Sequence, residues 1–261
     1  MHRTKGWTAS LIGLLSLTVL LWAYPQPAGA QSASACWDLA YAAIRHRAAA
    51  PHPPFILYDE TQAIVRDGLP LMSARASIAY RDDGVARISD ERFSFKPYVS
   101  RFMEPGPPEL GPYGGRRSIW LTIQGLDQSL PLIGEVRSNN GLTCTNEGVE
   151  RYKDHSAYHL SFTTQGKARP ALRTLLVDTA KSEIWKVVLS QYLPLPGTSI
   201  AAPPLVTFEI ELQEANQYLV VQHVTWKYEF REYSQWSTLF GEYYYSDFQF
   251  PAQMPVTLFQ D

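Results

Sequence analysis

The sequence predicts a mainly β protein, built as one curved antiparallel sheet with an N-terminal helix. From Met72 onwards, apolar residues recur at every second position through most of the chain, which is the period of a half-buried strand. Short turns separate the alternating segments, as is typical of antiparallel strands. A long sheet with one apolar face must curl or be covered. A barrel-like sheet wrapped on one helix therefore fits the pattern best.

The first 30 residues predict a secretory signal peptide. Arg3 and Lys5 begin it, and Leu11 to Trp22 is apolar but too short to cross a bilayer comfortably. Ala28-Gly29-Ala30 supplies the small residues of a cleavage site. An uncleaved membrane anchor is less favoured, because two prolines follow the apolar stretch. We expect secretion across the inner membrane, most simply into the periplasm, and a single mature domain over residues 31–261 that is not an integral membrane protein.

Charge and cysteine content narrow the class of protein. The chain carries 23 Lys and Arg against 25 Asp and Glu, a formal net charge of −2. This balance gives no electrostatic reason to bind nucleic acid. The only two cysteines, Cys36 and Cys144, can form a disulfide in an oxidising compartment, although the sequence does not give the distance between them. A lipid anchor on Cys36 is less favoured, because the apolar stretch ends well upstream of it.

The expected elements follow from caps, turns and alternation. Residues 36–50 predict a helix with Ser34 as N-cap and Asp38 in the first turn, and three prolines end it. Residues 104–115 predict a Pro/Gly-rich loop, and 125–137 a short helix. The expected strands cover residues 72–80, 85–89, 119–123, 158–162, 173–178, 183–192, 206–212, 218–230, 240–250 and 256–259.

The sequence carries no recognisable catalytic or cofactor motif, so we expect neither an enzyme nor a cofactor. It has no G-x-S-x-G elbow, no H-E-x-x-H and no phosphate-binding loop. His155 and His159 would suit zinc on a helix, but on the strand expected here their rings stand about 13 Å apart. His223 and Lys227 share the polar face of a strand, which solvent exposure explains. A hydrolase whose carboxylates or histidines converge only in three dimensions is a third-ranked alternative.

Aromatic residues on the inward faces of the C-terminal strands are the strongest functional signal. If the sheet curls around a single helix, part of its apolar face forms a hydrophobic cavity for a ligand. Ordinary core packing explains any one of these residues equally well. In the FGEYYYSDFQF stretch, a strict two-residue period turns Tyr244 and Phe248 inward and Tyr243 and Tyr245 outward. The candidate ligand-binding residues are Leu160, Phe162, Phe208, Ile210, Trp226, Tyr228, Phe230, Tyr244 and Phe248.

Three stretches resemble the LolA/LolB-like family of periplasmic lipoprotein carriers. They are GVERYKDHSAYHLSF (148–162), RTLLVDTAKSEIWKVVLSQY (173–192) and GEYYYSDFQFPAQMPVTLF (241–259). The shared pattern is a Y-x-L-x-F strand, a strand ending in Val-Asp, a turn and a strand carrying Ile-Trp. The resemblance implies an unclosed antiparallel β-barrel with helices as a lid over a hydrophobic cavity. The chain departs from the family in its 104–115 loop and in lacking a clear set of lid helices.

These observations favour a non-enzymatic, periplasmic binding protein for a lipid, an acyl chain or another hydrophobic ligand of the cell envelope. The family resemblance implies the same class, whose best-known members transport lipoproteins. The alternative is an envelope sensory or protein-interaction scaffold with a filled core, which binds a protein partner through an edge strand or the 104–115 loop. The sequence leaves the ligand, the partner and the oligomeric state open.

Overall fold

The computed structural model describes residues 33–82, 85–95, 142–164, 171–192, 205–232 and 234–259. The predicted signal peptide, the loop at 104–115, the strand at 119–123 and the short helix at 125–137 lie outside these residues. The elements are α2 (Ala33–Ala49), β1 (Phe55–Arg66), β2 (Leu69–Arg81), β3 (Ala86–Phe95), β4 (Leu142–Tyr152), β5 (His155–Thr164), β6 (Ala171–Asp178), β7 (Ile184–Tyr192), β8 (Leu205–Ala215), β9 (Tyr218–Glu232), β10 (Gln235–Gln249) and the 3-10 helix η5 (Val256–Phe259).

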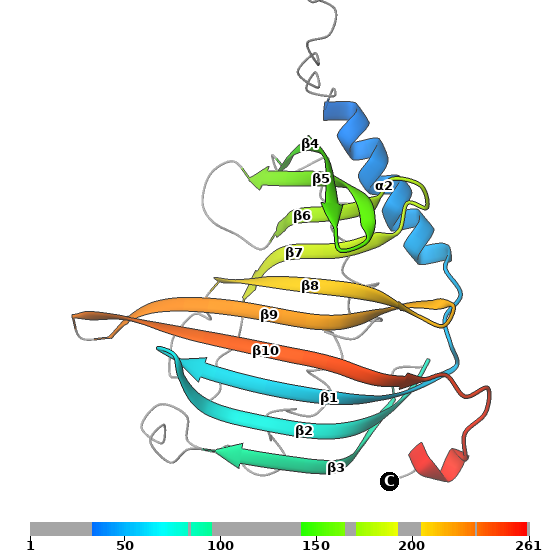
Figure 1. Cartoon of the computed structure of the whole chain (residues 1–261), viewed down its shortest axis with the longest axis vertical. Coiled ribbons are helices and arrows are strands. Elements are labelled where there is room, and N and C mark those ends of the chain that lie inside the picture. Colours follow the sequence, from blue (N-terminus) through cyan, green and yellow to red (C-terminus); the bar gives the residue numbers. More distant parts are fainter. Residues whose placement is uncertain are drawn as a thin grey trace, which may run out of the picture.

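The strands form one antiparallel sheet in the order β3-β2-β1-β10-β9-β8-β7-β6-β5-β4 (Figure 1). From β4 to β10 each strand pairs with the next along the chain, and the β1–β10 pair joins the N-terminal strands to the end of this meander. Within the described residues, β3 and β4 end the sheet and do not pair with each other. The predicted fold class, a mainly β protein with an unclosed antiparallel sheet and an N-terminal helix, is confirmed.

The turn between β1 and β2 fixes how the N-terminal strands meet the rest of the sheet. Asp67 and Gly68 have φ angles of 48° and 81°, the left-handed conformation that a tight hairpin turn requires. The Thr238 backbone N–H donates a 2.7 Å hydrogen bond to the Asp67 carboxylate. The Asp67 backbone N–H donates to the Thr238 carbonyl over 3.0 Å. The turn is therefore tied to β10 as well as closing its own hairpin.

Helix α2 packs against β4, β6 and β7 at one end of the sheet (Figure 1). The buried stripe of the helix is Cys36, Trp37, Ala40, Ala43 and Ile44, which recurs at helical spacing. Cys36 is joined to Cys144 on β4 by a disulfide with a Cα–Cα distance of 5.8 Å, the pairing that the sequence left open. None of the helices among the described residues has the length and apolarity needed to cross a membrane.

Two predicted elements differ from the structure, and two observed strands were missing from the prediction. The helix begins at Ala33, so Ser34 lies inside it instead of at the predicted N-cap, and Asp38 lies beyond its first turn. Residues 256–259 form a 3-10 helix instead of a strand, with the Leu258 N–H donating to the Pro255 carbonyl. Strands β1 and β4 were not predicted. β4 bulges at Gly148 (φ 116°), and β1 carries polar residues at inward positions, so both depart from simple apolar alternation.

Candidate functional site

The inner face of the sheet, on which α2 packs, divides into two halves. We name α2 with β4–β8 the stapled half, after its disulfide, and β9, β10 and β1–β3 the tyrosine half. A helix of 17 residues is about 25 Å long, whereas ten strands span about 43 Å across the sheet. The helix lies against the β4 end, so it covers only part of the inner face (Figure 1).

The stapled half is a closely packed core. Four predicted ligand-binding residues are 0–2% exposed there and share one hydrophobic cluster with the buried stripe of α2: Leu160, Phe162, Phe208 and Ile210. Trp37 contacts Phe162 edge-on, with 5.5 Å between the ring centroids. The helix thus packs on the inner face at this end of the sheet.

Three further predicted residues lie on the inner face of β9 in the tyrosine half. The indole of Trp226 lies against Gly241 on β10, where an added Cβ would come within 2.1 Å of the ring. Glycine is therefore required opposite this tryptophan. Tyr228 and Phe230 are half-buried and stack on each other, with 5.5 Å between centroids. The Arg66 guanidinium lies 5.3 Å from the Phe230 ring centroid, at the end of this aromatic row.

A β-bulge reverses part of the predicted tyrosine assignment. Asp247 has a φ of 57°, and the pairing with β1 shifts between Asp59↔Ser246 and Leu57↔Gln249. Residues on the two sides of the bulge therefore follow opposite parities. Tyr244 was predicted to point inward, but it is 47% exposed on the outer face, whereas Tyr245 is 4% exposed in the core.

Tyr244 belongs to the polar outer face of the sheet. Its ring stacks on His223 at 4.2 Å, and its hydroxyl donates to the Glu242 carboxylate over 2.6 Å. The prediction for Phe248, beyond the bulge, agrees with the structure: its ring stacks on the inner-face residue Tyr58 at 5.8 Å. The one-residue insertion explains both results.

Strand β1 contributes two buried polar side chains that the sequence did not single out. Glu60 and Gln62 are 0% and 2% exposed and lie on the inner face between Tyr58 and Ile64. Across the sheet, Glu60 faces Tyr245 on β10 and Ala76 on β2. The sequence signal that could have revealed them is the segment FILYDETQAIVR. Every second residue of this segment faces inward, as in a strand, but the inward residues in its middle are polar.

Hydrogen bonding around these two residues is incomplete. The Gln62 amide donates from Nε2 to the Tyr243 hydroxyl over 2.9 Å. Gln62 Oε1 and both carboxyl oxygens of Glu60 are buried and receive no hydrogen bond. Buried polar atoms without partners are uncommon in folded proteins and concentrate where function demands them.

Burial controls the protonation of Glu60 and of the tyrosines beside it. It raises the pKa of Glu60 to about 8, so the carboxyl group is mostly protonated near neutral pH. Burial also raises the pKa of Tyr58, with contributions from Glu60 and Tyr80. The pKa of Tyr243 rises to about 12 for the same main reason, with Glu60 adding to the effect. The centre of the tyrosine half is therefore uncharged near pH 7 but contains a carboxyl group that titrates slightly above it.

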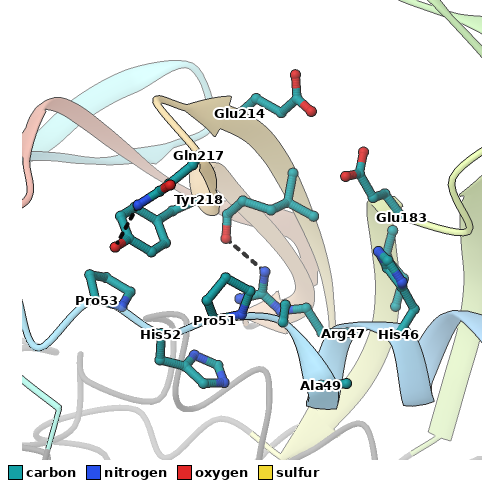
Figure 2. A pocket seen from close by; sticks show the side chains of 13 residues that line it. His46, Arg47, Ala49, Pro51, His52, Pro53, Glu183, Glu214, Gln217 and Tyr218 are labelled. Carbon is teal, nitrogen blue, oxygen red and sulfur yellow. Dashed lines mark hydrogen bonds between the residues drawn. The ribbon is translucent and has the colours of Figure 1, made fainter.

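A separate pocket of about 250 Å³ lies at the C-terminal end of α2 (Figure 2). Residues of the helix end, the segment 50–53 and the β8–β9 turn line it, and the Arg47 guanidinium reaches across to donate to the Leu219 carbonyl over 2.7 Å. His46, Glu183 and Glu214 add polar groups. None of the predicted ligand-binding residues lines this pocket.

The histidines singled out in the sequence pair with separate carboxylates on the outer face. His159 lies 3.0 Å from Glu150, and His155 lies 3.8 Å from Asp178. His223 lies 2.9 Å from Glu242. In the part of the chain that the structure describes, no three His, Cys, Asp or Glu residues gather in a metal-binding group.

The Val-Asp, turn, Ile-Trp pattern of the family resemblance has a structural role. Asp178 accepts hydrogen bonds from the backbone N–H groups of Ala180 and Lys181, each over 2.8 Å. Its second oxygen accepts from the indole N–H of Trp185 over 3.1 Å. The aspartate therefore fixes the β6–β7 turn and anchors the tryptophan of the next strand.

The comparisons with known proteins give structural matches only. No family model and no curated protein matches the sequence. Among the structural matches is a LolA superfamily protein. This structure, from Nitrosomonas europaea, is 11% identical, with a TM-score of 0.37, and the match covers 85% of this chain and 97% of that one.

Two further matches have similar coverage. A DUF1329 family protein from Desulfovibrio piger is 11% identical with a TM-score of 0.39, covering 87% of this chain and 96% of that one. The MucA/MucB complex structure from Pseudomonas aeruginosa is 10% identical with a TM-score of 0.24, covering 86% and 95%. Identities and scores this low transfer no ligand, partner or cellular location to this chain.

Proposed function

We propose that this chain is a non-enzymatic binding protein of the cell envelope, which holds a lipid, acyl chain or similar hydrophobic ligand against the inner face of its tyrosine half. The observation that carries the proposal is the difference between the two halves. Helix α2 packs mainly against β4, β6 and β7, whereas the inner-face aromatic rows of β9 and β10 include half-buried rings. Ligand sites are typically lined by apolar and aromatic side chains with a few polar groups.

The proposed contact residues are a subset of those that the sequence suggested. Trp226, Tyr228, Phe230 and Phe248 remain, because they lie on the inner face of β9 and β10, away from the strands that α2 mainly contacts. Tyr245 takes the place of Tyr244, which lies on the outer face. A periplasmic location is part of the proposal. The predicted signal peptide supports it, and so does the Cys36–Cys144 disulfide, since disulfides persist in oxidising compartments.

Uptake of the neutral apolar probe 1,6-diphenylhexatriene tests this function. The probe fluoresces when it enters an apolar site, so the wild-type protein should show saturable binding. Replacing both Tyr228 and Phe230 with serine should weaken binding at least tenfold, because two apolar contacts are lost. Trp236→Ser is the matched control, since this ring is 73% exposed on the same hairpin. Absence of saturable uptake by the wild-type protein, or equal uptake by both variants, would contradict the proposal.

A scaffold function is the second candidate, favoured by the open edges of the sheet. Strands β3 and β4 each pair on one side only within the described residues. Such edges can accept a strand from a protein partner. Pull-down from envelope extract with and without residues 104–115 tests the predicted contribution of that loop, and equal recovery would argue against it.

A further inference from the structure

The buried polar row on β1 points to the chemistry of the ligand's head group. We propose that the tyrosine half binds a long-chain primary amine or an amine-bearing lipid, whose ammonium group is held by Glu60 and Gln62. The inference rests on the proposed function, because it assumes that a hydrophobic ligand occupies this face. It adds a specific head group and two residues that select it.

The first argument is the number of hydrogen-bond acceptors that lack a donor. Glu60 Oε1, Glu60 Oε2 and Gln62 Oε1 are all buried, and none receives a hydrogen bond. A primary ammonium group carries three N–H donors and no acceptor. Once the Glu60 carboxyl group has lost its proton, the ammonium group can therefore donate to all three oxygens. An alcohol offers one donor and a quaternary ammonium group offers none, so both leave buried acceptors unpaired.

The second argument is the placement of these acceptors. Glu60 and Gln62 lie two positions apart on the same face, so their Cα atoms are about 6.6 Å apart and their side chains can converge on one group. Ala76 pairs with Glu60 and Ala74 pairs with Gln62 on β2, and both alanines are buried. Their side chains are too short to reach the three oxygens. The β2 side of the row is thus lined by methyl groups.

The third argument is the aromatic surroundings. Tyr58 and Tyr245 flank Glu60 along and across the sheet, with 5.8 Å between their ring centroids. Aromatic faces attract cations, and the attraction is strongest where water is excluded. From Tyr58 the rings continue through Phe248 to Phe250, with centroid distances of 5.8 and 6.3 Å. This row offers an apolar surface for the tail of the same ligand.

Binding of a cation changes the charge of Glu60. The titratable groups that flank it on β1, β2 and β10 are Tyr58, Tyr80, Tyr243 and Tyr245, and none of the described side chains around it on these strands is cationic. Near pH 7 the carboxyl group is mostly protonated. When the ammonium ion enters, Glu60 releases its proton to solvent and the two ions pair. Amine affinity should therefore increase with pH until Glu60 is already ionised.

The experiment compares dodecylamine, dodecanol and dodecyltrimethylammonium by calorimetry at pH 6, 7 and 8. At pH 8 dodecylamine should bind ten- to a hundredfold more tightly than dodecanol, as expected for a charge-assisted hydrogen bond. Its affinity should fall about tenfold from pH 7 to pH 6, with release of about one proton per ligand. The affinity of dodecanol should not change with pH in this way.

Variants assign the effect to the residues. Glu60→Gln preserves the shape of the side chain and should abolish both the preference for amine over alcohol and the proton release. Gln62→Leu, which removes one acceptor, should reduce amine affinity by a smaller factor. Glu229→Gln, an exposed glutamate on β9, is the control and should behave as wild type. Thermal unfolding of each variant establishes that it is folded before it is compared.

The outcomes separate this inference from the proposed function. If diphenylhexatriene binds but dodecylamine shows no preference over dodecanol, the head-group assignment is wrong and the apolar site stands. If amine preference persists in folded Glu60→Gln, the assignment is also wrong. Tight binding of dodecyltrimethylammonium would show that charge and aromatic faces suffice, which contradicts the argument from three donors. If neither the apolar probe nor any of the three ligands binds, the proposed function itself fails.

Discussion

The stapled half and the tyrosine half are built from the same kind of strand, yet they use their inner faces differently. In the stapled half, the inward residues Leu160, Phe162 and Phe208 are apolar and almost fully buried, and Trp37 of α2 contacts Phe162. In the tyrosine half, the inward positions carry aromatic rings together with the Glu60 carboxyl group and the Gln62 amide. The carboxyl oxygens and the amide oxygen receive no hydrogen bond. The first arrangement favours packing, whereas the second retains buried polar groups that weaken a core and that the proposed function assigns to ligand binding.

The difference teaches where stability and function lie in an unclosed sheet. One helix cannot cover ten strands, and the disulfide holds it at the β4 end. The end of the sheet that α2 contacts can therefore provide most of the folding stability. This stability allows the other end to keep buried polar groups that lack hydrogen-bond partners. The predictions below test this division of roles.

Loss of the disulfide should have the largest effect. Cys36 and Cys144 are 108 positions apart, and closing a loop of that size stabilises a protein by about 5 kcal/mol through the entropy of the unfolded chain. Replacing both cysteines with serine should lower the free energy of unfolding by several kcal/mol, measured by urea denaturation. Dithiothreitol should reproduce the loss in the wild-type protein. A change below about 1 kcal/mol would mean that packing alone holds α2 in place.

Truncating one aromatic residue in each half should show the difference in packing between the two halves more directly. Phe208→Ala removes a ring that is 2% exposed and should cost about 4 kcal/mol. Phe230→Ala removes a half-buried ring and should cost about 1 kcal/mol, because less contact is lost. Comparable costs from parallel urea titrations would show that the tyrosine half is packed as solidly as the stapled half.

The pH dependence of stability should report on Glu60. Its pKa of about 8 in the folded protein lies above its unfolded value, so the folded state holds a proton that the unfolded state releases. Between about pH 5 and pH 8 the free energy of unfolding should therefore decrease with rising pH, by up to roughly 1.4 kcal/mol per pH unit from this group. Glu60→Gln should remove this slope, whereas Glu229→Gln should retain it. A slope that survives in Glu60→Gln belongs to other groups.

The sequence predicted the fold class well because alternation and turns are local properties. Val206, Phe208 and Ile210 alternate with polar residues, so β8 was found without knowledge of its neighbours. The candidate ligand-binding residues lie on the inner face, Tyr244 excepted, and their binding role stays a prediction. What the sequence could not give was the position of α2, which decides which inward residues the helix contacts.

The errors occurred where local rules are broken. The bulge at Asp247 reversed the facing of Tyr244, and a positive φ at an aspartate is not visible in a two-residue period. Strand β1 was missed because Glu60 and Gln62 stand at inward positions where apolar residues are expected. Departures from local consistency often mark functional positions, and here they coincide with the proposed head-group site.

Photo-crosslinking with a diazirine-bearing long-chain alcohol tests the central claim most directly, because it locates the ligand without relying on the head-group inference. After irradiation and digestion, mass spectrometry should find adducts on peptides from β9, β10 and β1, and the yield should fall when unlabelled dodecanol competes. Peptides from β5 and β6 should remain unlabelled. Specific labelling confined to the stapled half or to the pocket at the end of α2, or no competed labelling at all, would contradict the account.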